Sequence, residues 1–160
     1  MSVKGTSRCQ LRYLWAMVRF EATVEISRPA EQVFDFVSDL ENDARWVKNW
    51  HSKRTSQARE LGATYARWYH WPLGKPVEAA VTVTAWERPR RFAFESVTAD
   101  GKAVIEFRFE PTAGGVRVTK IDQMHHGGVM GFVSKVFAFG FRSDLRRILR
   151  NLKAVVEAAP

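Results

Sequence analysis

The sequence predicts an α+β domain built from one antiparallel sheet, two short helices and a long C-terminal helix. Residues 18–26 alternate apolar and polar side chains, which is typical of a half-buried strand. Six further strand-like runs follow, and their short Gly, Pro or Asp links favour antiparallel neighbours. From residue 129 the apolar period becomes that of an amphipathic helix.

The first strand and the helices after it have explicit start signals. The apolar residues of the strand share one face: Val18, Phe20, Ala22, Val24 and Ile26. Pro29 suits the first turn of a helix because its missing N–H needs no partner there, and Glu31 favours the positive end of the helix dipole. The apolar stripe of this helix is expected to comprise Val33, Phe36, Val37 and Leu40. A second short helical turn is expected at residues 44–46.

The next part of the chain predicts six strands: Trp50 to Gln57, Thr64 to Trp71, Val77 to Trp86, Arg91 to Thr98, Lys102 to Phe109, and Val116 to Gln123. Asp100-Gly101 is the clearest hairpin signal, because both residue types tolerate the positive φ of a type I′ turn. Gly114-Gly115 is interpreted as another hairpin and not as a phosphate-binding loop, since no helix follows it.

The last segment predicts one long amphipathic helix. Its apolar stripe is Val129, Phe132, Val133, Val136, Phe137, Gly140, Phe141, Leu145, Ile148, Leu149, Leu152 and Val156. The basic residues lie mostly on the opposite face: Lys135, Arg142, Arg146, Arg147, Arg150 and Lys153. Gly140 inside the helix is expected to mark a kink or a close approach, either to packed sheet side chains or to a bound ligand.

Length and composition indicate one domain in a reducing compartment. The chain of 160 residues is long enough for one domain with a core. We expect residues 1–16 to be an N-terminal extension, disordered or upstream of a true start at Met17, and residues 17–160 to form the domain. A single cysteine, Cys9, excludes an internal disulfide and a thiolate zinc site, which favours a cytoplasmic location. No apolar run reaches the roughly 20 residues that cross a bilayer.

The net charge of +8 raises the question of an anionic partner. The basic residues are spread along the chain and do not alternate with aromatic ones on an evident strand face, so no nucleic-acid partner is expected. The basic face of the terminal helix leaves two readings, a solvated outer face, which we favour, or a surface for an acidic partner or an anionic membrane. No stable membrane insertion is expected, and the domain is expected to be a monomer or homodimer.

Four stretches of the chain carry a family resemblance: VEISRPAEQVFDFVSDLENDARW, TAWERPRRFAFES, FEPTAGGVRVT and DLRRILRNLKAVVE. In these stretches, which cover nearly everything after Met17, the chain resembles the polyketide cyclase/dehydrase and lipid-transport family of the START-like, or Bet v 1-like, superfamily. The resemblance implies the helix-grip fold, in which a seven-stranded curved antiparallel sheet wraps around a long C-terminal helix and two short helices follow the first strand. It also implies a cavity between sheet and helix, and it carries over no universal catalytic residue.

Such a cavity binds a ligand mainly by burying apolar surface, with a few placed polar groups. By analogy with the fold, we expect its lining to include Trp46, Trp50, Tyr65, Trp68, Phe94, Phe107, Met124, Phe132 and Phe137. The predicted function is binding of a small hydrophobic molecule such as a lipid, sterol, quinone or polyketide-like compound. No cofactor is expected.

The alternative function is a cyclase, dehydratase or aromatase that moves protons by general acid–base catalysis in the same cavity. The polar candidates are Arg67, His70, Glu95, Glu106, Asp122, His125 and His126. For Arg67, His70 and Glu95 we favour a position on the outer face of the sheet. The four histidines, His51, His70, His125 and His126, show no metal-ligand spacing, so no metal site is expected.

Overall fold

The computed structural model describes residues 16–70, 75–99, 101–126 and 138–159. The predicted extension up to residue 15, Trp71, the predicted start of the terminal helix at residues 129–137, and the lining candidates Phe132 and Phe137 lie outside the described residues. Within the described part of the chain, no helix is both long enough and apolar enough to cross a bilayer.

The order of elements confirms the predicted α+β architecture. Strand β1 (Ala16–Ile26) is followed by helix α1 (Ala30–Val37) and the 3-10 helix η1 (Leu40–Arg45). Six strands come next: β2 (Trp50–Arg54), β3 (Thr64–Tyr69), β4 (Val77–Glu87), β5 (Arg91–Thr98), β6 (Gly101–Thr112) and β7 (Gly115–His126). Helix α3 (Ala138–Ala158) ends the fold.

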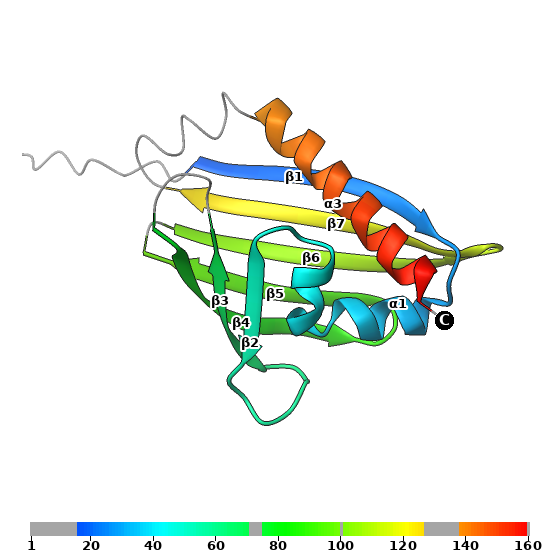
Figure 1. Ribbon diagram of the computed structural model, residues 1–160, viewed down its shortest axis with the longest axis horizontal. Coiled ribbons are helices and arrows are strands. Elements are labelled where there is room, and N and C mark those ends of the chain that lie inside the picture. The colour runs from blue at the N-terminus through cyan, green and yellow to red at the C-terminus, as the bar shows by residue number, and fades with distance from the viewer. Residues whose placement is uncertain (1–15, 71–74, 100, 127–137, 160) are drawn as a thin grey trace, which may run out of the picture.

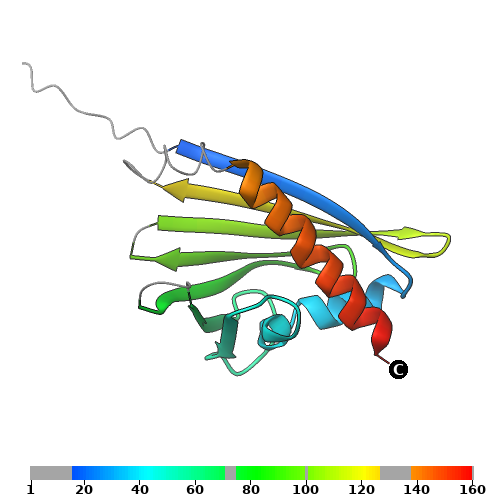
Figure 2. The same ribbon diagram turned by 45° about the horizontal axis from the view of Figure 1, so that its top comes forward.

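The seven strands form one antiparallel sheet in the order β1-β7-β6-β5-β4-β3-β2. Strand β1 crosses from the start of the chain to pair with β7, while β2 to β7 each pair with the next strand along the chain. Figures 1 and 2 show the sheet curving, with α3 lying diagonally across one of its faces. We call this face, which α1 and η1 also adjoin, the inner face of the sheet.

The inner face carries the hydrophobic core because both α3 and α1 bury their apolar sides against it. Helix α3 contributes Leu145, Leu149, Leu152 and Val156, all buried. Phe34 of α1 is fully buried and makes edge-on ring contacts with three sheet residues, Trp86, Phe92 and Phe109. Large buried rings of this kind contribute most of the apolar area removed from water.

The short helices differ from the prediction in their bounds and in one core residue. The buried face of α1 is formed by Ala30, Val33, Phe34 and Val37, whereas Phe36 is only half-buried. The predicted stripe left out Phe34, while Phe36 packs against the edge of the core with its ring centroid 5.0 Å from Cζ of Arg45. Leu40 does not extend α1 but begins η1, where Asp39 accepts a hydrogen bond from the N–H of Glu41. This side-chain cap starts a new helical turn.

Several strand ends also differ from the prediction. Strand β2 ends at Arg54 and β3 at Tyr69, so both are shorter than predicted, while β6 and β7 are longer. The predicted hairpin between β5 and β6 is present, but Gly101 pairs with Thr98 and is the first residue of β6. Gly101 is therefore part of a strand and not of the turn.

Gly115 is required by a close approach of two backbone segments. Its φ is +148°, and an added Cβ would lie 2.1 Å from the carbonyl oxygen of Ile26. We expect Gly115→Ala to lower the free energy of unfolding by about 1–3 kcal/mol, because the backbone must either move away from Ile26 or remain strained. Gly114→Ala is the matched control, since an added Cβ there meets no atom within 4 Å. Urea unfolding of both variants tests this, and equal stabilities would contradict it.

Candidate functional site

The strand register decides which side chains face α3. Residues directly paired across neighbouring strands share a face. Phe20 of β1 pairs with Asp122, which pairs with Ile105, which pairs with Phe94. The same alternation continues through β4 to β2 and places on the inner face five of the predicted lining residues, namely Trp50, Tyr65, Phe94, Phe107 and Met124.

Two further lining candidates in the described residues have different positions. Trp46 follows η1, is buried, and packs edge-on against Phe107 with ring centroids 6.2 Å apart. Trp68 pairs with His51 and Glu78, both exposed, and so lies on the outer face. Because side chains alternate along a strand, Tyr65 and Trp68 of β3 cannot both face inward. The register removes Trp68 from the inner face.

Arg67 is the central polar residue of the inner face. It lies two residues after Tyr65 on β3 and is only 1% exposed. Its Nε donates to Ser52 Oγ at 2.9 Å, and its Nη2 donates to Asp43 Oδ2 at 2.5 Å. The expected position on the outer face was therefore wrong for Arg67.

Two aromatic rings enclose the guanidinium of Arg67. Its Cζ lies 4.9 Å from the ring centroid of Trp50 and 4.8 Å from that of Phe94. Cation–π contacts within about 6 Å are attractive and are strongest where water is excluded. Together with Ser52 and Asp43, the two rings hold the guanidinium in one orientation on an apolar wall.

A second charged pair lies on the inner face of β7. Lys120 is 3% exposed and its Nζ forms an ion pair with Asp122. The same Nζ lies 5.6 Å from the ring centroid of Phe107. Lys120 interacts electrostatically with Asp43, and Asp122 with Arg67, so the two pairs form one group. We call Asp43, Arg67, Lys120 and Asp122 the inner charge cluster.

Burial dominates the electrostatics of this cluster. Desolvation raises the pKa of Asp43 to about 6, in spite of the opposing attraction of Arg67 and Lys120 and the hydrogen bonds from Ser52 and Arg67. Desolvation also lowers the pKa of Arg67, against the attraction of Asp43. A guanidinium stays protonated in proteins. Asp43 is thus a carboxyl group that can gain or lose a proton near neutral pH beside a fixed positive charge.

Hydrogen-bonding capacity remains unused at this face. The indole Nε1 of Trp46 is buried and has no hydrogen-bond acceptor among the described residues. The hydroxyl group of Tyr65, on the same face, is likewise buried and has no hydrogen-bond partner among the described residues. Most buried polar atoms in proteins are paired, so such donors are places where a ligand oxygen can bind.

The other polar candidates do not join the cluster. His70 is exposed. Glu95 is paired with Lys102, and Glu106 is paired with Arg91 and Arg108, all on the outer face. His125 pairs across the sheet with Met17 and Lys102, which also places it on the outer face. Nothing is described for the side chain of His126.

Sequence reasoning missed Asp43, Ser52 and Lys120. Asp43 lies in an acidic stretch before Trp46, which is typical of a solvent-exposed segment, yet it is 3% exposed. Lys120 could have been found by counting, because it alternates with Val118 and Val116 on one face of β7. The sequence holds no comparable signal for Asp43 and Ser52, which come to Arg67 from separate elements.

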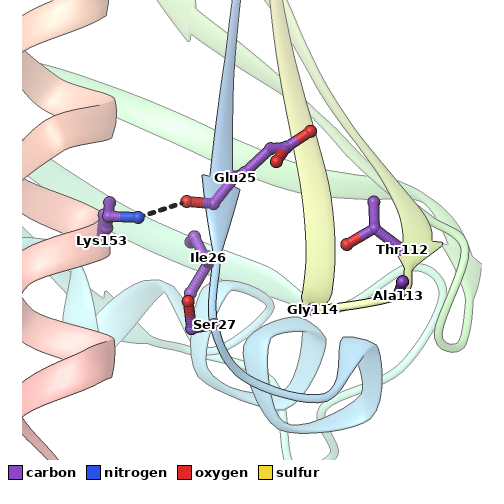
Figure 3. Close-up of a pocket in the computed structure, with 7 residues that line it drawn as sticks. All are labelled: Glu25, Ile26, Ser27, Thr112, Ala113, Gly114 and Lys153. Carbon is purple, nitrogen blue, oxygen red and sulfur yellow. Dashed lines mark hydrogen bonds between the residues drawn. The ribbon is translucent and has the colours of Figure 1, made fainter.

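A separate pocket of about 330 Å³ lies where β1 ends beside the β6–β7 hairpin and α3. Figure 3 shows its lining, which consists of Glu25, Ile26, Ser27, Thr112, Ala113, Gly114 and Lys153. Lys153 Nζ donates to the carbonyl oxygen of Glu25 at 2.7 Å. The pocket has no aromatic side chain and no member of the inner charge cluster, so the cluster is the better candidate for a functional site.

Comparison with solved structures supports the fold. Protein CV1439 from Chromobacterium violaceum is similar, with a TM-score of 0.68, 16% identity, and coverage of 90% of this chain and 99% of that one. The di-domain ARO/CYC BexL from the BE-7585A biosynthetic pathway has a TM-score of 0.72 and 17% identity, over 91% of this chain and 52% of that one. Ara h 8.0201 has a TM-score of 0.68 and 13% identity, over 89% of this chain and 99% of that one.

The strands and α3 together form the helix-grip architecture that these neighbours share. No curated protein matches the chain. The family model described as polyketide cyclase / dehydrase and lipid transport matches residues 17–157, which include every member of the inner charge cluster. The chain therefore belongs to the polyketide cyclase/dehydrase and lipid-transport family.

Proposed function

We propose that the inner face binds a small hydrophobic molecule, such as a lipid, sterol, quinone or polyketide-like compound, and that Arg67 holds an oxygen of this molecule. The observation that carries the proposal is the position of Arg67, buried on the inner face between the rings of Trp50 and Phe94. Apolar walls with few placed polar groups are typical of small-molecule sites.

The energetics of the cluster support a role beyond folding. A buried ion pair contributes little net stability, because desolvation of the two charges offsets their attraction. Apolar residues of similar volume would stabilise the core as well or better. Binding offers a reason for the arrangement, since the guanidinium is already desolvated and is oriented by Ser52 and Asp43.

The second candidate is a cyclase, dehydratase or aromatase acting on a polyketide-like substrate. The specific observation in its favour is Asp43, whose pKa is raised to about 6 beside Arg67. A carboxyl group with a pKa near the working pH is suited to general acid–base catalysis. The names of two structural neighbours, the di-domain ARO/CYC proteins StfQ and BexL, support the same candidate.

Ligand binding can be tested with three probes: a hydroxylated anthraquinone, a short-chain ubiquinone and palmitate. Quenching of tryptophan fluorescence and calorimetry measure the affinity for the wild type and for the double variant Asp43→Asn/Arg67→Met. We expect at least one probe to bind, and the double variant to weaken its binding about 10- to 100-fold, because a hydrogen bond to a charged group contributes about 1.5–3 kcal/mol.

The matched control is Glu106→Gln/Arg108→Met, which removes an ion pair from the outer face. It should bind like the wild type. No binding of any probe would contradict the binding function, and equal binding by both double variants would contradict the role of Arg67. Turnover of a poly-β-keto thioester, lost in Asp43→Asn, would establish the enzyme instead.

A further inference from the structure

Basic residues on the outer face of the sheet and basic residues on α3 differ in whether an acidic side chain pairs with them. On the outer face of the sheet, the basic side chains of Arg19, Arg91, Lys102, Arg108 and Arg117 each lie within ion-pair distance of a glutamate. On α3, Arg142, Arg146 and Arg150 are exposed and have no ion-pair partner among the described residues. Exposed cations without an ion-pair partner in the described part of the chain also occur elsewhere, at Lys53, Lys75 and Arg90, but only on α3 do three of them recur along one described helix.

These arginines form a continuous stripe. Arg142, Arg146 and Arg150 follow each other at a spacing of four residues, so the stripe extends about 12 Å along the helix. Arg147 adds a fourth guanidinium and is paired with Asp144. We call Arg142, Arg146, Arg147 and Arg150 the helix basic face. Like charges at this spacing destabilise an isolated helix, so the pattern is not explained by helix stability.

A segment next to α3 also carries exposed cations. Asn151 Nδ2 donates to the carbonyl oxygen of Trp46, which brings the end of η1 next to the helix. Arg45 and Lys48, on either side of Trp46, are both exposed. Figure 1 shows α3 and the η1 segment on the same side of the sheet. Two more exposed cations therefore lie on the segment that contacts α3 through Asn151.

The geometry points to an anionic membrane surface as the partner of the helix basic face. We propose that the protein docks there peripherally, with guanidinium groups on lipid phosphates and without insertion. Guanidinium groups match phosphate oxygens bidentately. Among the described side chains of α3, no large apolar one is exposed. Protein interfaces rely on such buried anchors, whereas electrostatic attraction to an anionic bilayer does not.

Docking would place the binding site beside a store of apolar molecules. The same helix carries Leu145, Leu149 and Leu152 on its buried side, against the inner face of the sheet. The helix basic face and the wall of the candidate site are therefore opposite sides of one element. The docking proposal itself rests on the charges and does not require the proposed ligand.

The test is flotation with vesicles of 30% phosphatidylglycerol in phosphatidylcholine, at 50 mM and 500 mM NaCl, with no ligand added. We expect the wild type to bind at low salt, to be released at high salt, and not to bind pure phosphatidylcholine. Arg142→Gln/Arg146→Gln/Arg150→Gln should bind on the order of 100-fold more weakly, since each basic residue near an anionic surface contributes about fivefold.

The control Arg19→Gln/Arg108→Gln/Arg117→Gln removes the same number of charges from the outer face, and it should float like the wild type. Circular dichroism checks that each variant is folded. Equal loss in both triple variants, or no flotation of the wild type at low salt, would overturn the proposal. So would binding to polyglutamate or duplex DNA without binding to vesicles.

The two proposals can fail separately. Asp43→Asn/Arg67→Met should still float with anionic vesicles, because it leaves the helix basic face intact. If this variant floats but binds no probe, the change concerns only ligand binding and leaves membrane docking intact.

Discussion

Arg67→Met is expected to lower the free energy of unfolding by about 3–5 kcal/mol at pH 8, because removal of one partner leaves a buried charge uncompensated. The charge left without a partner is that of Asp43, which is 3% exposed and loses its 2.5 Å hydrogen bond from the guanidinium. Urea unfolding measured by tryptophan fluorescence gives the value. At pH 5 the loss should be smaller, since a protonated Asp43 is neutral and tolerates burial better.

Two variants make this expectation specific. Asp43→Asn/Arg67→Met removes both charges, so most of the lost stability should return. Arg108→Met breaks an exposed ion pair on the outer face, and such pairs contribute at most about 1 kcal/mol. If Arg67→Met were as stable as Arg108→Met, or if the double variant were no better than the single one, the ion pair would not be the cause.

The second large effect is a dependence of stability on pH that originates at Asp43. Its pKa is about 6 in the folded protein against an ordinary value of 3.8. Between these values the folded state binds more protons than the unfolded state, so stability falls as the pH rises. The contribution is fully present below pH 3.8 and is lost as the pH rises through 6, and two units correspond to about 3 kcal/mol.

A comparison with Asp43→Asn isolates this contribution. The free energy of unfolding of the wild type minus that of the variant should decrease by about 2 kcal/mol between pH 4 and pH 7 and then stay constant. Asp35→Asn is the control with the opposite sign, because the hydrogen bond from Arg88 lowers the pKa of Asp35. A difference for Asp43→Asn that does not change with pH would show that the attraction of Arg67 fully compensates for burial.

Much of the fold could be predicted from the sequence, because local start signals and the periodicity of apolar residues indicate the helices and strands. Pro29 precedes α1, which begins at Ala30, and the alternation after Val18 produces β1. The spacing of four and then three residues along Leu145, Leu149 and Leu152 indicates the buried side of α3 before any contact is known. Errors concern element ends, where competition between a helix and its cap decides the boundary, and the omission of Phe34 from the buried stripe. The close approach expected at Gly140 is also not found, since an added Cβ there would meet no atom within 4 Å.

The candidate site could be predicted only in part. Trp46, Trp50, Phe94 and Phe107 were expected near a ligand and lie around the inner charge cluster. Arg67 was assigned to the wrong face. On β3 both faces mix apolar and polar residues, since Tyr65, Arg67 and Tyr69 alternate with Thr64, Ala66 and Trp68. The pattern therefore shows which side chains share a face without showing which face is covered.

The sequence by itself determined the element order, the antiparallel hairpins and the amphipathic sides of β1 and α3, because hydrogen-bonding geometry imposes periods of 2 and 3.6 on local segments. Only the tertiary structure decided that Arg67 lies inside and meets Asp43 and Ser52. Those partners come from η1 and β2, up to 24 residues away, and their meeting depends on how the curved sheet closes over η1. Burial then gives these charged side chains the properties of the candidate site, because removal of water strengthens their interactions and shifts the pKa of Asp43.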